Sequence, residues 1–179
     1  MGYSPAEAPQ GFLATFSLFV ARFCTSAWIG AATLFVIVGV TEITRGGFDT
    51  VTKDMLVSVR FPAYYLSGAT LICGGWLGGF FAGHSTAFPR LRRISVLILL
   101  TLVLAIMAVD YVLIYLPLLR MVVPPGQAKP SSFIQYHEAS KWVNLAGLTL
   151  CLAAATLLQW PTSTRSEPEQ GSRSDVDAR

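Results

Sequence analysis

The stretch ISVLILLTLVLAIMAVDYVLIY, residues 94–115, decides the class of fold. Its 22 residues contain one charged side chain, that of Asp110. About 20 apolar residues in a helix cover a hydrocarbon core of roughly 30 Å, because each residue adds about 1.5 Å. The stretch therefore predicts a transmembrane helix that carries a carboxylate inside the bilayer.

Three further stretches of the sequence are also long and apolar enough to form transmembrane helices. Of 179 residues 53% are hydrophobic and 13% are charged, and the charged residues gather between the apolar runs. A bilayer interior offers no water to backbone amides, so segments of this length satisfy their hydrogen bonds as helices. The sequence predicts an all-α fold, a four-helix transmembrane bundle over residues 23–160, with spans at about 23–43, 61–83, 94–116 and 142–160.

The two ends differ from this domain. Residues 1–22 lack the positive flank and cleavage site of a secretory signal, so we expect no removal of this segment. A helix continuous with the first span would exceed the bilayer thickness, which predicts that residues 1–22 form a partly interfacial helix with Arg22 reaching the headgroups. Residues 161–179, PTSTRSEPEQGSRSDVDAR, predict a disordered polar tail.

Basic residues predict the orientation. With four spans, the loop HSTAFPRLRR at 84–93 lies on the same side as both termini and packs Arg90, Arg92 and Arg93 into ten residues. The opposite loops spread their basic residues over longer stretches. The positive-inside rule therefore predicts cytoplasmic termini, and we expect a plasma membrane location, most simply a bacterial inner membrane.

Glycine spacing predicts how the helices pack. Glycines four residues apart let helix backbones approach closely in a bilayer. The second span carries such rows in ICGGWLGGFFAG, and the first and fourth spans carry smaller ones. The predicted packing positions are Gly74, Gly75, Gly78, Gly79, Gly83, Gly30 and Gly147.

Polar side chains gather near one end of the predicted bundle. The stretch FIQYHEASKWVN at 133–144 precedes the fourth span, and helix geometry places its polar side chains along one stripe. An ionisable group inside a span costs about 2.5–3.5 kcal/mol, so we expect Asp110 to face the bundle interior toward Lys141 or His137. The candidate polar cluster is Asp110, His137, Ser140, Lys141, Asn144, Glu42, Arg60, Tyr64 and Tyr65.

Two interpretations of this cluster stay open. In one, Asp110 binds a ligand or handles protons. In the other, Asp110 only joins two helices through an ion pair, while His137 and Glu138 are solvated and the tyrosines anchor the helix at the interface.

Other chemistries find little support. His84 and His137 fall at opposite ends of the predicted spans, which disfavours haem held by both. Cys24, Cys73 and Cys151 lie in three different spans, unlike a disulfide framework or a zinc site. We expect no metal or cofactor, no basic face for nucleic acid, and no catalytic constellation, so the sequence does not predict an enzyme.

Three segments together carry a family resemblance. AWIGAATLF in the first span, RFPAYYLSGATL opening the second and FIQYHEASKWVNLAGL opening the fourth resemble the transmembrane protein 205-like family (domain of unknown function 4149). The matching positions are Trp28, Gly30, Phe61, Pro62, Tyr64, Tyr65, Phe133, His137, Ser140 and Asn144. The resemblance covers about residues 20–160 and implies a four-helix, multi-pass membrane protein without an agreed activity. Glu138 and Lys141 are more charged than its pattern suggests.

Three functional hypotheses follow. The first is a non-enzymatic protein that binds, or helps to translocate, a small solute or ion through the polar pocket, after forming a homo-oligomer. The second is an accessory or scaffold subunit that docks other membrane-protein subunits on the glycine face of the second helix. The third is a haem- or metal-linked membrane protein.

Overall fold

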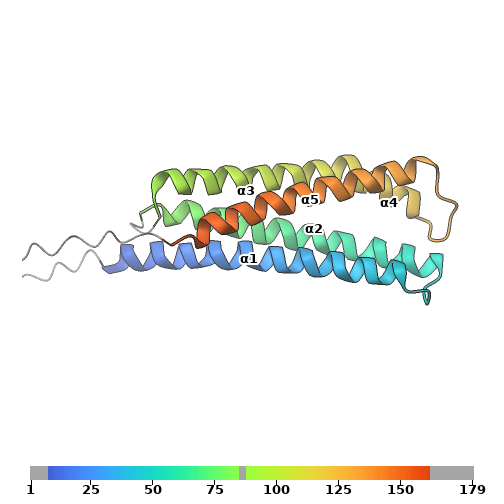
Figure 1. Ribbon diagram of the computed structural model, residues 1–179, viewed down its shortest axis with the longest axis horizontal. Helices are drawn as coiled ribbons and strands as arrows, with labels where there is room; N and C mark the ends of the chain where they lie inside the picture. Colours follow the sequence, from blue (N-terminus) through green and yellow to red (C-terminus); the bar gives the residue numbers. More distant parts are fainter. Residues whose placement is uncertain (1–7, 85–87, 162–179) are drawn as a thin grey trace, which may run out of the picture.

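The computed structural model describes residues 8–84 and 88–161, which form four helical rods packed side by side (Figure 1). The first two rods are α1 (Ala8–Thr44) and α2 (Thr50–Phe81), which a short 3₁₀ turn, Ala82–His84, follows. The third rod comprises α3 (Arg90–Asp110), a π-helical turn (Tyr111–Tyr115) and α4 (Leu116–Val122). The fourth is α5 (Ser132–Gln159). All four rods are long and apolar enough to cross a membrane, which confirms the predicted fold class.

The described chain begins and ends at the same end of the bundle, while loops 45–49 and 123–131 lie at the other (Figure 1). We call these the terminal end and the distal end. Residues 1–7 of the predicted N-terminal segment, residues 85–87 of the basic loop and residues 162–179 of the predicted tail lie outside the described residues.

The helices extend further toward the distal end than the apolar windows suggested. α2 begins at Thr50, where the Asp49 side chain accepts a hydrogen bond from the amide of Thr52 at 2.9 Å and so caps the helix. α5 begins at Ser132, so the polar stretch 133–144 belongs to the helix itself. Polar and charged residues precede the apolar windows in both helices, among them Lys53 and Asp54 in α2 and Glu138 in α5, so the apolar runs begin later than the helices do.

The closest helix contact joins α1 to α2 through the predicted glycine row. A Cβ atom placed on Gly78 would lie 2.6 Å from the carbonyl oxygen of Ser17 and 2.7 Å from the amide nitrogen of Ala21. A Cβ on Gly75 would lie 2.9 Å from Oγ1 of Thr25. Only glycine allows this approach, which brings Ser17 and Ala21 of α1 against α2.

The other glycines divide into two groups. Gly74 faces Cys24, Gly79 faces Leu97 and Gly147 faces Ile106, each at a distance from the added Cβ of 3.0 to 3.8 Å. Gly83 lies beside the guanidinium of Arg93. Gly30 is exposed, and a Cβ there would meet nothing within 4 Å. The prediction that Gly30 packs against another helix of the chain is therefore wrong.

A further part of the core lies between α3 and α5. Val96, Leu100 and Val103 of α3 are buried with Cys151 and Leu158 of α5. The opposite face of the third rod leaves large apolar side chains exposed, among them Ile98, Leu102, Val109, Val112 and Leu113. This face suits contact with lipid tails.

Candidate functional site

A buried carboxylate lies at the centre of the candidate site. Asp110 is 2% exposed, although it sits in the most apolar of the four rods. Its Oδ2 accepts a hydrogen bond from the Tyr65 hydroxyl at 2.6 Å and another from Nδ2 of Asn144 at 3.0 Å. Three helices, α2, α3 and α5, therefore meet on one oxygen atom.

The other carboxylate oxygen is different. Oδ1 of Asp110 is buried and has no hydrogen-bond partner among the described residues. A narrow pocket reaches Asp110, with about 20 Å³ of space for the centre of a water-sized particle. A cavity needs about 10–15 Å³ by this measure to hold one water molecule. The pocket can thus hold a single small particle beside a carboxylate.

Aromatic and amide groups complete the pocket. Trp28, Tyr64 and Asn144 contribute to its lining, together with apolar side chains of α3 and α5. The Tyr64 hydroxyl donates a hydrogen bond to Oδ1 of Asn144 at 3.1 Å, and the rings of Trp28 and Tyr64 lie 4.9 Å apart. Nδ2 of Asn144 also approaches the backbone oxygen and Oγ of Ser140, at 2.9 and 3.2 Å. These bonds fix the amide so that its NH₂ group faces Asp110.

A local change in helix type positions Asp110. The π-helical turn Tyr111–Tyr115 begins directly after it, and Pro117 follows two residues beyond that turn. Proline has no amide proton, and its ring crowds the carbonyl four residues earlier, here that of Leu113. Widening the helix before the proline relieves this crowding. Isolated π turns of this kind occur often at functional sites.

The expected partners of Asp110 are not the observed ones. Nζ of Lys141 pairs with Oε1 of Glu138 at 2.6 Å, and both side chains are about half exposed, at 55% and 50%. His137 is also exposed, and its ring stacks on Phe133 with 6.1 Å between centroids. The prediction that Asp110 faces Lys141 or His137 is therefore wrong, while its interior position is as expected.

Glu42 and Arg60 form a separate pair nearer the distal end. The Arg60 guanidinium contacts the Glu42 carboxylate, and both side chains are about one quarter exposed. The guanidinium also lies over the Phe35 ring, 5.2 Å from its centroid. Tyr65 comes five residues after Arg60 in α2, so the pair lies about 8 Å from the level of the Asp110 site. Glu42 and Arg60 can shield the distal approach to the pocket but do not line it.

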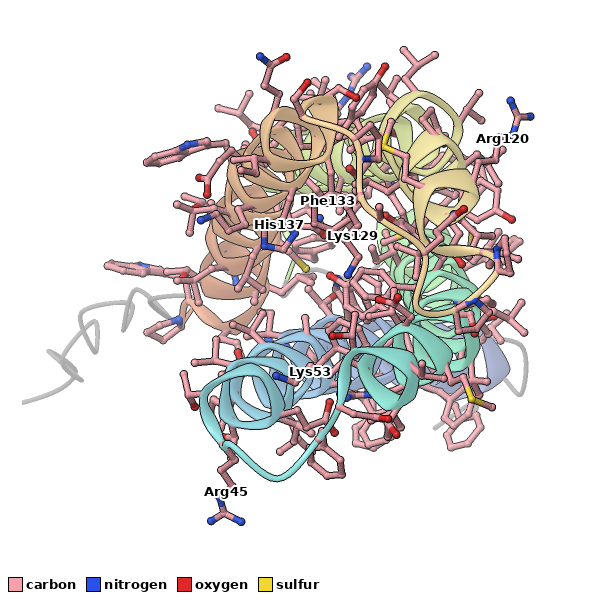
Figure 2. All side chains as sticks on the ribbon, turned by 90° about the vertical axis from the view of Figure 1, so that its right-hand side faces the viewer. Arg45, Lys53, Arg120, Lys129, Phe133 and His137 are labelled. Atoms are coloured by element: carbon pink, nitrogen blue, oxygen red, sulfur yellow. The ribbon has the colours of Figure 1, made fainter. Side chains whose placement is uncertain are left out.

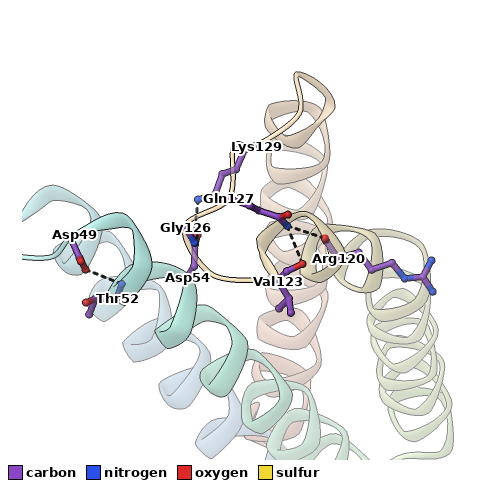
Figure 3. Close-up of polar contacts among 8 residues, drawn as sticks. All are labelled: Asp49, Thr52, Asp54, Arg120, Val123, Gly126, Gln127 and Lys129. Atoms are coloured by element: carbon purple, nitrogen blue, oxygen red, sulfur yellow. Dashed lines mark hydrogen bonds and ion pairs between the residues drawn. The ribbon is translucent and has the colours of Figure 1, made fainter.

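A second buried carboxylate escaped the sequence analysis. Asp54 of α2 is 2% exposed, accepts a hydrogen bond from the Gly126 amide at 3.0 Å and pairs with Nζ of Lys129 at 2.8 Å (Figure 3). The same Nζ lies 5.0 Å from the centre of the Phe133 ring. Viewed from the distal end, Lys129, Phe133 and His137 lie between the helices, whereas Arg45 and Arg120 point outward (Figure 2). Asp54 therefore fixes loop 123–131 over this end of the bundle.

No metal cluster appears in residues 8–84 and 88–161, where no three or more histidine, cysteine, aspartate or glutamate side chains come close enough to hold an ion. The backbone of His84 follows α2 at the terminal end, while His137 lies in the distal part of α5. The described arrangement thus offers no pair of histidines for a haem.

No protein-family model, curated protein or solved structure matches this chain. The four long apolar helices fit a four-helix membrane protein, which is the coarser part of the family resemblance. The particular family is not shown. The chain is a multi-pass membrane protein by the length and composition of its helices.

Proposed function

We propose that this multi-pass membrane protein binds a small cation at the Asp110 pocket, as a non-enzymatic protein that holds the ion or helps it across the bilayer. The observation that supports this proposal is the buried, unpartnered Oδ1 of Asp110, a residue that also lines a pocket of one-particle size. A buried acceptor without a donor costs free energy, which a cation or a hydrogen-donating particle would recover.

The rest of the pocket favours a positive ligand. Trp28 and Tyr64 present aromatic surfaces, which attract cations through the negative faces of their rings. Lys141 is turned away and paired with Glu138, so no described lysine or arginine neutralises Asp110 directly. Intramembrane acids of this kind usually mark ion or proton paths.

A binding test follows from linkage. The purified full-length chain is melted in detergent with lithium, sodium or potassium chloride at one ionic strength, and across a range of pH for the proton. A ligand at about 100 times its Kd adds about 2.7 kcal/mol of stability. We expect one of these ions to raise the Tm of the wild type and not of Asp110→Asn, which keeps the shape of the side chain but removes its charge.

Glu138→Gln is the matched control, because it removes an exposed carboxylate far from the pocket. It should respond to the ion as the wild type does. Equal responses of the wild type and Asp110→Asn to every ion and pH would contradict the proposal. Flux of the same ion into proteoliposomes, lost in Asp110→Asn, would then distinguish translocation from binding alone.

An accessory-subunit role is the alternative proposal. The glycine row of α2 is covered by α1, so that face cannot dock a partner as first expected. The open face of α1 around Gly30 supports a different docking position, because a Cβ there meets nothing in the chain. Gentle solubilisation followed by mass analysis tests this alternative: a subunit at fixed stoichiometry that is lost in Gly30→Leu would support it. Both proposals place the protein in a plasma membrane with its two termini in the cytoplasm. The basic residues of the 84–93 loop support this orientation.

A further inference from the structure

A lipid-facing groove separates α1 from α5 at the terminal end of the bundle. Its volume is about 460 Å³, within the range of about 300–1,000 Å³ that small-molecule sites occupy. Ser26 and Ile29 of α1 line one wall. The other wall comes from Leu152, Ala155, Thr156, Gln159 and Trp160. Most of this lining is apolar, and the side chain of Gln159 bridges the walls by donating a hydrogen bond to Oγ of Ser26 at 3.2 Å.

Two arginines bind the end of α5, next to the residues that line this groove. Nε of Arg22 donates to the carbonyl oxygen of Leu158 at 2.8 Å, and Nη2 of Arg92 donates to the same oxygen at 3.3 Å. Nε of Arg92 also contacts the carbonyl oxygen of Leu157, and its Nη2 contacts the carbonyl oxygen of Trp160, which lines the groove. The carbonyls of Leu157 and Leu158 belong to the last turn of α5, which lacks helical donors and carries partial negative charge. Two full positive charges therefore meet about half a negative charge, which leaves an excess of positive charge at the groove mouth.

The mouth lies at the level expected for lipid headgroups. Arg22 and Glu42 are twenty residues apart on α1, a distance of about 30 Å that matches the hydrocarbon core. Trp160, beside the mouth, is 64% exposed, as expected of a tryptophan at a membrane interface. From this level the groove runs along Ile29 and Leu152 toward the bilayer interior.

We propose that one anionic phospholipid occupies this groove, with its phosphate at Arg22 and Arg92 and an acyl chain along Ile29 and Leu152. Phosphate matches a guanidinium that still has donors to offer beyond Nε, and basic pockets between transmembrane helices select anionic headgroups. The apolar walls match an acyl chain better than they match a free anion. This site is independent of the Asp110 pocket, which lies nearer the distal end.

Native mass spectrometry of the full-length chain tests the site. Phosphatidylglycerol and phosphatidylcholine with identical acyl chains are titrated separately into the detergent-solubilised protein. We expect tighter binding of phosphatidylglycerol, reduced about fivefold in Arg22→Gln and retained in Arg22→Lys, because one arginine near a surface contributes about that factor. Ser26→Phe, which fills the groove, should weaken the binding of both lipids.

Two controls match these variants. Arg120→Gln removes a basic side chain at the distal end, and Ala31→Phe enlarges an exposed residue of α1 outside the groove. Both should bind lipid as the wild type does. Equal binding of the two lipids by the wild type, or binding unchanged in Ser26→Phe, would overturn the proposal. A wild type that binds neither lipid would also overturn the proposal, as expected if a second copy or residues 162–179 cover the groove.

Discussion

The Tyr65 hydroxyl donates a 2.6 Å hydrogen bond to Asp110, and so joins α2 to α3 inside the apolar part of the bundle. The bond is short, as expected when a hydroxyl donates to a carboxylate. It holds one carboxylate oxygen, Oδ2, and leaves Oδ1 without a partner among the described residues. The same contact thus stabilises the helix pair and fixes the orientation of the acid.

Replacing Tyr65 by phenylalanine should destabilise the fold. The change removes one donor from a buried carboxylate, which costs about 1–3 kcal/mol. Unfolding by a denaturing detergent, followed by circular dichroism, measures the loss. Tyr111→Phe is the matched control, because Tyr111 is 38% exposed and its ring packs on Tyr65 without a hydrogen bond to Asp110. Similar losses in both variants would show that the bond to Asp110 adds nothing beyond the loss of any tyrosine hydroxyl at this site.

Gly78 and Gly39 provide a matched test of helix packing. Gly78→Ala should destabilise the protein by about 1–3 kcal/mol, because the added Cβ overlaps the Ser17 carbonyl of α1. A Cβ on Gly39 meets nothing within 4 Å, so Gly39→Ala should be neutral or stabilising, as alanine favours helices by up to about 1 kcal/mol. Detergent unfolding of the two variants measures both changes. A neutral Gly78→Ala would contradict the close α1 to α2 contact.

The sequence indicated the bundle and the interior position of Asp110 because both follow from the cost of placing polar groups in lipid. The partner of Asp110 could not be found in the same way. Ser140 and Lys141 differ by about 100° around the helix axis. A stripe that includes both is therefore wider than the face that can point at Asp110. Ser140 and Asn144 face the interior, and Lys141 falls outside it with Glu138. The rotation of α5 about its own axis, which helix packing sets, decides which of these side chains reaches Asp110.

The sequence also gave no sign of the Asp54 cluster. Its partners Gly126 and Lys129 come 72 and 75 residues later, in a loop whose path depends on the packed helices. At Gly30 the sequence predicted a contact that the structure lacks, because a small residue with the right spacing can face lipid as well as another helix. The spacing of small residues predicts that close contact is possible, and the neighbouring helices decide where it occurs.

Lys129→Met should release loop 123–131 from α2. The variant removes the ammonium from buried Asp54 but keeps a side chain of similar length over Phe133. Because Lys129 is 31% exposed, we expect a modest global loss of about 1 kcal/mol and faster hydrogen exchange at the Gly126 amide. Mass spectrometry resolves exchange in this loop. Arg45→Met, which removes a basic side chain that points outward at the same end of the bundle (Figure 2), is the control and should leave exchange in the loop unchanged.

Asp49 should make the start of α2 sensitive to acid. Its side chain accepts the hydrogen bond from Thr52, which holds the pKa of the carboxyl below its usual value. A pKa lowered by folding means that this contribution is complete above the unfolded pKa, about 3.9, and is lost as the pH falls through the folded pKa. Asp49→Asn keeps a capping oxygen without a titrating group. The wild type should therefore lose stability relative to Asp49→Asn below about pH 4, in thermal melts compared across pH, and a difference that stays constant from pH 7 to pH 3 would contradict the cap.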